Sequence, residues 1–170
     1  THPNQIVARR HVREVLFANR TYYVRSDGSD TSSGIADSPS GAFLTIQKAI
    51  DTVATLDLSV YNVTISVQTG TWSAPLSVTA PWVGSGTVIL QGNGGTLNVT
   101  GICVNVSGTG SRITIAGFTL IASAIGLQAT NGGMIALGAG MVFGACSAYH
   151  IRANGPGSII QAEGVSYSVT

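Results

Sequence analysis

A sequence repeat in the second half of the chain constrains the fold more than any other feature. Within residues 125–167, a segment that begins at Ile125 is followed by a similar one that begins at Ile151. The matching pairs, whose numbers all differ by 24, are Ala129 and Ala153, Gly133 and Gly157, Ile135 and Ile159, and Gly140 and Gly164. Short apolar runs separated by Gly, Asn and Pro at a fixed period indicate stacked β-type units. We therefore predict a β-solenoid, in which each coil buries its apolar side chains against neighbouring coils.

Similar strand-like runs extend the pattern toward the N-terminus, at Val63–Val67, Val88–Leu90, Ile113–Ile115 and Met134–Leu137. The numbers of Ile65, Ile89 and Ile113 rise in steps of 24, and Ile135 follows Ile113 by 22. We interpret these isoleucines as equivalent positions of successive coils whose loops differ in length. Because stacked strands lie about 4.8 Å apart, about four or five coils form a stack only about 20 Å tall.

The composition suits one stacked β domain and excludes several other classes. Hydrophobic residues make up 44% of the 170 positions and charged residues only 9%, which disfavours disorder and a helical bundle. The net charge of +1 argues against a nucleic-acid partner. No run of about 18 apolar residues is present, so we predict no membrane insertion. Cys103 and Cys146 lie in apolar runs far apart in sequence and are predicted to be buried free thiols.

The first twenty residues differ from the rest in charge. They hold four arginines and one glutamate, so their net charge is +3 and that of the remainder is −2. Ala8, Val12, Val15 and Leu16 share one face at helical spacing, which predicts a helix to about Ala18. We interpret residues 1–20 as a helical arm that docks or trimerises the chain. The alternatives are a helix packed on its own domain and a nucleic-acid arm. The proposed docking and oligomerisation residues are Arg9, Arg10, Val12, Arg13 and Leu16.

A short strand, a polar loop and an amphipathic helix are predicted next. After the strand Thr21–Val24, the loop Asp27–Gly34 fits a series of Asx turns better than a calcium loop, because an EF-hand would need Glu where Ser38 stands. Within Phe43–Leu58, the apolar residues Ile46, Ala49, Ile50, Val53 and Ala54 follow helical spacing, with Thr45 as N-cap. Such a helix before a solenoid is expected to cover the first coil.

The segment from Tyr22 to Trp72 resembles the entry of right-handed parallel β-helix proteins. It joins Tyr22-Tyr-Val, Asp27-Gly-Ser-Asp-x3-Gly34, Ala42-Phe-Leu-Thr-Ile-Gln-Lys-Ala-Ile-Asp51, Val63-Thr-Ile-Ser-Val and Gly70-Thr-Trp72. It is most similar to versions in bacteriophage and prophage tail spikes and tail fibres, within the pectate-lyase-like superfamily. These motifs mark the cap of the fold and no site, so they are weakly specific for function. The resemblance implies a homotrimer.

The predicted coils lack the residues that polysaccharide-cutting β-helices need. Such enzymes use paired carboxylates, and Glu163 is the only acid after residue 62. We therefore predict no catalytic site, and also no cofactor or metal, because the three histidines are isolated in the sequence. Trp82, beside glycines, is a possible surface contact. It is interpreted as a packed loop anchor, a subunit contact or an exposed sugar-stacking residue.

The predicted fold is all-β: a short right-handed parallel β-helix with an N-terminal helical arm and an amphipathic capping helix. The arm covers residues 1–20, the entry and cap 21–61, and the coils 62–170. The predicted function is structural, as the proximal, particle-anchoring part of a phage or phage-like tail spike or fibre, assembled in the bacterial cytoplasm. The arm would bind other virion proteins, and a longer chain would reach host surface polysaccharide.

Two other functions remain open. The first is the N-terminal fragment of a β-helix polysaccharide lyase or hydrolase whose catalytic residues lie beyond residue 170. The second is a secreted carbohydrate-binding adhesin. The pattern runs to the last residues without a capping element, and an uncovered solenoid end is an aggregation surface. We therefore expect that the native chain continues past Thr170 or that another chain covers this end.

Overall fold

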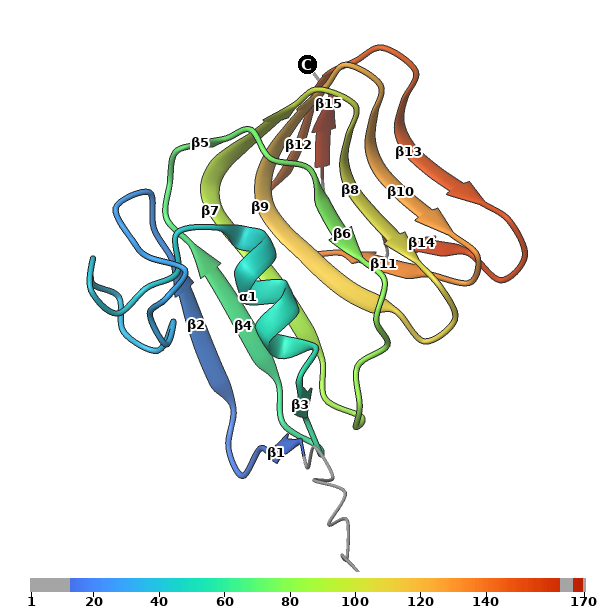
Figure 1. Ribbon diagram of the computed structural model, residues 1–170. Helices are drawn as coiled ribbons and strands as arrows, with labels where there is room; N and C mark the ends of the chain where they lie inside the picture. Colours follow the sequence, from blue (N-terminus) through green and yellow to red (C-terminus); the bar gives the residue numbers. More distant parts are fainter. Residues whose placement is uncertain (1–12, 163–166, 170) are drawn as a thin grey trace, which may run out of the picture.

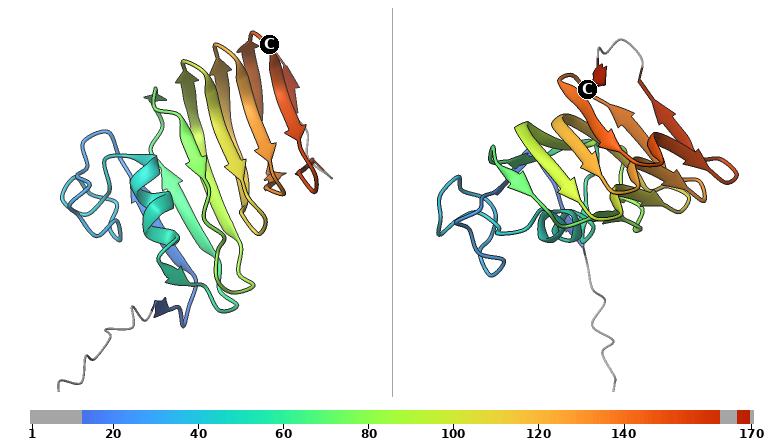
Figure 2. Two further views of the ribbon diagram at one scale, coloured as in Figure 1. Left: turned by 45° about the vertical axis from the view of Figure 1, so that its right-hand side comes forward. Right: turned by 90° about the horizontal axis from the view of Figure 1, so that it is seen from above.

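The computed structural model describes residues 13–162 and 167–169 and shows a parallel β-solenoid of about four turns with one short helix (Figure 1). The prediction of a short parallel β-helix with a capping helix is thereby confirmed. Figure 2 shows the coils as a row of parallel strands, with α1 beside the first coil and the C-terminal strands at the other end.

In the described residues, fifteen strands and one helix follow one another along the chain. They are β1 (Glu14–Val15), β2 (Arg20–Val24), α1 (Ile46–Val53), β3 (Leu56–Asp57), β4 (Val63–Val67), β5 (Thr71–Trp72), β6 (Leu76–Val78), β7 (Val88–Val99), β8 (Ile102–Ser107), β9 (Arg112–Ala122), β10 (Ile125–Thr130), β11 (Met134–Leu137), β12 (Met141–Cys146), β13 (Tyr149–Asn154), β14 (Ile159–Gln161) and β15 (Tyr167–Val169).

Three parallel walls surround the core. The first wall runs in the order β2, β4, β7, β9, β11, β14 and uses the first halves of the long strands β7 and β9. The second halves of these strands continue into the second wall, with β5, β12 and β15. The third wall consists of β6, β8, β10 and β13. Each coil therefore hydrogen-bonds only to the coils beside it, as a solenoid requires.

The strand register corrects the predicted alignment of several isoleucines by one residue. In the first wall Ile65 pairs with Leu90 and not with Ile89, and Ile135 pairs with Ile160 and not with Ile159. Leu90 is fully buried, whereas Ile89 is half-buried and points outward beside Thr114. A shift of one residue moves a side chain to the opposite face of a strand. The predicted alignment matched isoleucines by residue type and did not consider which face of the strand each one occupies.

Other predicted pairings hold. Ala129 pairs with Ala153, and Ile113 pairs with Ile135, although the second pair is closer in sequence than the first. The loops between coils absorb these differences in length, while the inner positions stay in line. Inside, the walls bury a continuous apolar core, whose largest fully buried side chains include Phe43, Phe118 and Phe143.

Helix α1 covers the first coil as predicted. Its inward face, formed by Ile46, Ala49, Ile50 and Val53, is 0–2% exposed. The side chain of Thr45 accepts a hydrogen bond from the amide of Lys48, which confirms the predicted N-cap. The helix lies within the predicted segment Phe43–Leu58 and ends at Val53, and residues 56 and 57 form β3, which pairs with β1.

The polar loop before α1 is held by its own side chains. The carboxylate of Asp30 accepts hydrogen bonds from the amides of Leu44 and Thr45 at 2.9 Å and from the Thr45 hydroxyl at 2.8 Å. Gly34 has a φ of 77°, and a Cβ there would lie 2.2 Å from Cε2 of Phe43. A side chain at position 34 would therefore displace the ring that stacks on Tyr22 at 5.7 Å.

Arg25 joins the two acidic ends of this loop. It lies 2.8 Å from Asp27 and 2.9 Å from Asp37, and its hydrogen bond lowers the pKa of Asp27. The described residues contain no group of three side chains that could hold a metal ion. The loop between β2 and α1 is thus held together by its own ion pairs and hydrogen bonds, and we call it the clasp.

The predicted N-terminal helix is wrong over its described part. Glu14 and Val15 form β1, which pairs in parallel with β3 (Figure 1). Val15 is 41% exposed and Leu16 only 1%, so these two neighbours point to opposite sides, as they do in an extended chain. Helical spacing placed Val15 and Leu16 on one face together with Ala8 and Val12, whereas the extended chain places Val15 and Leu16 on opposite sides. The helix prediction for residues 1–12 falls outside the described residues.

Candidate docking surface at the capped end

The structure gives structural roles to the described members of the predicted docking set. Arg9, Arg10 and Val12 lie outside the described residues. The Arg13 guanidinium donates to the carbonyl oxygens of Ala54 and Leu56, the latter at 3.3 Å, and so satisfies groups at the end of α1. Leu16 is buried in the core. Neither side chain is a free docking group here, because both attach the start of the described chain to the cap.

Three short segments lie side by side at this corner of the molecule. Val15 pairs with Asp57, and Asp57 forms a parallel bridge with Val83. The backbone amide of Leu16 donates to the carbonyl oxygen of Asp57, and the backbone amide of Leu58 donates to the carbonyl oxygen of Val83, both at 2.9 Å. Leu16 and Leu58 are buried beneath this row. Val15 in β1 and Phe17 in the bend that follows it are exposed on either side of the buried Leu16.

An exposed apolar cluster results, which we call the docking corner and define as Val15, Phe17, Val60 and Val83. Their exposed fractions are 41%, 84%, 69% and 38%. Val60 belongs to the turn that follows β3, in which Tyr61 donates to Leu58. Figure 1 shows β1 beside β3 at this corner of the molecule. Exposed apolar side chains that gather in one place mark interaction surfaces more often than scattered ones do.

Asparagine side chains fix the corner to the coils. The amide of Asn62 donates to Oδ1 of Asn19, and the amide of Thr87 donates to Oδ1 of Asn62, both at 2.9 Å. Beside them Arg20 contacts Glu14 at 2.6 Å, and this hydrogen bond lowers the pKa of Glu14. The corner therefore offers a positioned, mainly apolar surface in which Asp57 lies between Val15 and Val83, with the Glu14–Arg20 ion pair at its edge.

Phe17 is the residue that sequence reasoning missed. The helical interpretation grouped Val15 with Leu16 on one face and gave Phe17 no docking role. Val15, Leu16, Phe17 and Ala18 are four consecutive apolar residues, so the sequence has no alternation here that distinguishes the outward Phe17 from the buried Leu16.

Trp82 is a packed anchor, which excludes the surface-contact and sugar-stacking interpretations. Its side chain is 5% exposed, and its indole N–H donates to the carbonyl oxygen of Arg112. The two thiols are free, as predicted. Cys103 is fully buried, and burial raises its pKa to about 12. Cys146 is half-buried, and burial raises its pKa as well. A raised pKa keeps a thiol protonated and therefore a poor nucleophile.

Comparison with protein-family models, with curated proteins and with solved structures finds no significant match to this chain. Among the described residues, no helix is long and apolar enough to cross a membrane. The resemblance to tail spikes therefore depends on the entry motifs and on the parallel solenoid that contains them.

Proposed function

We propose that the chain is a structural component of a phage or phage-like particle, the anchoring part of a tail spike or fibre. The docking corner seats it on another virion protein. The observation that carries this proposal is Phe17, which is 84% exposed and yet directly follows a residue that is 1% exposed. Because the buried Leu16 fixes the backbone beside it, the Phe17 ring already faces outward before a partner binds.

The energetics favour such a role for the corner. Transfer of one large apolar side chain from water into a pocket contributes about 1.5–3 kcal/mol, and aromatic residues are enriched among the side chains that dominate interfaces. Arginines at positions 9 and 10 precede the corner in sequence. A partner with an apolar pocket and an acidic rim would match both features.

The decisive experiment is to purify particles from the bacterial culture that produces the chain and to detect the chain in them by immunoblotting. We expect the native chain in the particle fraction. Absence of the native chain from purified particles would contradict the virion assignment.

A variant pair tests the corner itself. Phe17→Asp together with Val60→Asp should remove the chain from particles without changing its thermal unfolding, because both side chains are exposed. Ile35→Asp is the matched control, since Ile35 is 49% exposed but lies in the loop before α1. Retention of the double variant in particles would show that the chain docks through another surface.

The homotrimer is part of the same proposal. Closed symmetry is the usual outcome when identical chains associate, and the resemblance to tail spikes implies three copies. Light scattering on the chain with and without residues 1–12 measures this. A trimeric mass that falls to a monomeric mass on truncation would assign oligomerisation to the arm. A monomer in both cases would leave the arm as a tether only.

A further inference from the structure

The loop between β6 and β7 joins the docking corner to the coils, and we call its residues 82–86 the strap. Val83 of the strap belongs to the docking corner. Its carbonyl oxygen accepts a hydrogen bond from the backbone amide of Leu58 at 2.9 Å, and the backbone amide of Ser85 donates to the carbonyl oxygen of Ser59 at 2.7 Å. The strap is therefore bonded to the turn that follows β3.

Two glycines let the strap lie directly against that turn. A Cβ at Gly84 would lie 2.5 Å from the backbone nitrogen of Ser59, and a Cβ at Gly86 would lie 1.8 Å from the carbonyl oxygen of Tyr61. Both distances are far below van der Waals contact, so no side chain fits between the two segments. The turn carries the docking-corner residue Val60, so a shift of the strap would displace Val60 as well.

A second set of contacts holds the strap from the side of the coils. One terminal nitrogen of the Arg112 guanidinium, in β9, donates to the carbonyl oxygens of Gly84 and Gly86, at 2.8 and 3.3 Å. The indole of Trp82, inside the strap, donates in return to the carbonyl oxygen of Arg112. Backbone carbonyl groups that leave water need donors, and a charged donor forms the stronger kind of hydrogen bond. A single side chain thus satisfies two carbonyl groups of the strap.

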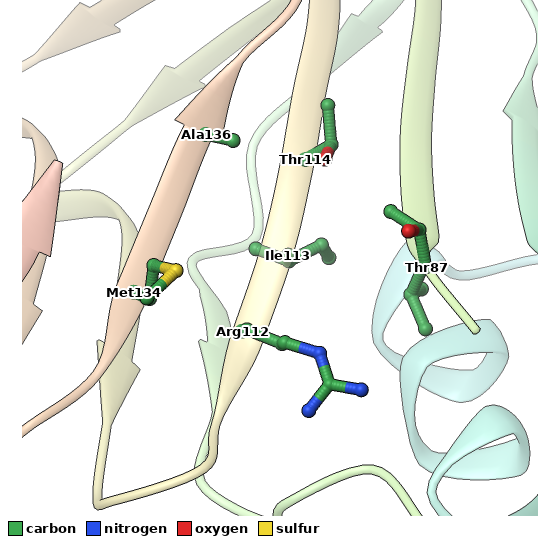
Figure 3. A pocket seen from close by; sticks show the side chains of 7 residues that line it. Thr87, Arg112, Ile113, Thr114, Met134 and Ala136 are labelled. Carbon is green, nitrogen blue, oxygen red and sulfur yellow. The ribbon is translucent and has the colours of Figure 1, made fainter. Parts of the chain in front are cut away.

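Arg112 reaches the strap along the outer face of the first wall. In Figure 3 its side chain extends from β9 toward Thr87, beside a hollow of about 180 Å³ that is lined by Thr87 and by residues of β7, β9 and β11. In the described part of the chain, the side-chain hydrogen bonds of this half-buried arginine all go to the strap. Because the hollow leaves room beside the side chain, a substitution at position 112 tests the donors more than the packing.

We propose that Arg112 is a positioning residue for the docking corner. Its guanidinium fixes the strap, and the strap fixes Val60 and Val83 in the arrangement that a partner meets. A surface that is arranged before binding loses less conformational freedom when the partner docks, which raises the affinity. This inference rests on the proposed docking role of the corner. Its structural half, the hold of Arg112 on the strap, is measured without a partner.

Amide hydrogen exchange of the isotope-labelled chain tests the structural half. Arg112→Met removes the donors and keeps an unbranched side chain. The amides of Leu58 and Ser85, which bond the strap to the turn, should then exchange at least about tenfold faster, while those of the third wall keep their native rates. Arg152→Met is the matched control, because Arg152 is the other arginine of the coils and lies over the ring of Tyr149. Native exchange rates in Arg112→Met would overturn the inference.

The amount of the chain in purified particles tests the functional half. Apparent affinity falls in proportion to the fraction of chains in the arranged form, so Arg112→Met should lower this amount at least about threefold. Arg112→Lys keeps one charged nitrogen near the strap and should lie between Arg112→Met and the native chain in both measurements. Circular dichroism shows whether each variant is folded, and Arg112→Lys decides the test if Arg112→Met is not. Faster exchange at the strap with a native amount in particles would contradict the positioning role.

Failure of the proposed function gives a different pattern. If the native chain is absent from particles, or if Phe17→Asp with Val60→Asp remains in them, the docking role of the corner is wrong whatever the exchange rates are. If the native chain is present and that double variant is lost, equal amounts of the native chain and Arg112→Met in particles contradict only the inference about Arg112.

Discussion

The first coil and the last described coil of the solenoid differ in how far their apolar side chains are covered. Beside the first coil, α1 covers the inner face, and Ile46 and Ile50 are each 2% exposed. In the last described coil, Tyr149 is 54% exposed, and the inward-facing Ile151 and Ile160 are only half-buried. A single coil cannot bury its own apolar side chains, so burial has to come from a neighbour. The cap supplies that neighbour at one end, whereas no described element supplies it at the other.

Equivalent positions in adjacent coils make the contrast direct. Ile125 is 4% exposed, and its partner one coil later is Tyr149. Leu127 is fully buried, and its partner Ile151 is only half-buried. The paired residues are apolar or aromatic in both coils, but those of the later coil are less buried. The energetic value of an apolar side chain in this fold is therefore set by whether a coil follows it.

The largest effect is expected from a charge in the cap. Ile50→Asp places an unpaired carboxylate in the core and should destabilise the chain by about 4 kcal/mol or more. The matched change in the last described coil, Ile160→Asp, should cost about 1–2 kcal/mol, because that inward-facing side chain is only half-buried. Urea unfolding followed by circular dichroism measures both. Equal losses would show that the last coil is covered in solution.

A cavity in the coils should have the next largest effect. Leu127→Ala removes a fully buried side chain and should cost about 2–5 kcal/mol. Ile151→Ala, at the paired position of the next coil, should cost about 1 kcal/mol, since less area is lost from burial. The difference between the two midpoints in urea tests whether burial declines along the stack. A larger cost at Ile151 would reverse the comparison.

The clasp before α1 is expected to contribute less to the free energy of unfolding. Asp30→Ala leaves the amides of Leu44 and Thr45 without their acceptor and should cost about 1–2 kcal/mol. Asp51→Ala is the control, because Asp51 accepts only from the exposed side chain of Gln47. Thermal unfolding of both variants measures the difference. If Asp30→Ala unfolds like the native chain, the loop does not secure the cap.

The smallest effect comes from the ion pair at the docking corner. Glu14 has a side chain 58% exposed, so Glu14→Gln should cost no more than about 0.5 kcal/mol. Arg20 lowers the pKa of Glu14, so the contribution is present above its ordinary pKa of 4.5 and lost as the pH falls through the folded value. The free energies of unfolding of the native chain and Glu14→Gln should therefore converge at low pH. A gap that widens on acidification would contradict this sign.

Local chemistry made the cap predictable. Thr45 as N-cap, the apolar face of α1 and the turn-rich loop from Asp27 to Gly34 depend on residues close in sequence, and each is found as expected. The repeat also predicted the solenoid itself, because every coil must bury the same inner positions.

Register and surface roles depend on contacts between coils, which residue type alone does not encode. Ile89 and Leu90 are both apolar, and only the pairing with β4 and β9 shows which of them faces inward. Leu16 was predicted to be a docking residue, but its backbone amide bonds to Asp57 of β3 and its side chain is buried in the core. The hollow at Arg112 joins residues of β7, β9 and β11 that no local pattern connects.

The regular ladder of the first wall has a consequence for the order in which the molecule is built. From β4 onward, Ile65 pairs with Leu90, Leu90 with Ile115, and Ile135 with Ile160, so paired positions are separated by nearly constant lengths of chain. Each new coil therefore closes a loop of similar length onto a finished template, and the entropic cost does not grow along the chain. Because α1 is synthesised before all of these coils, a growing chain can add them one at a time to an end that is already sealed.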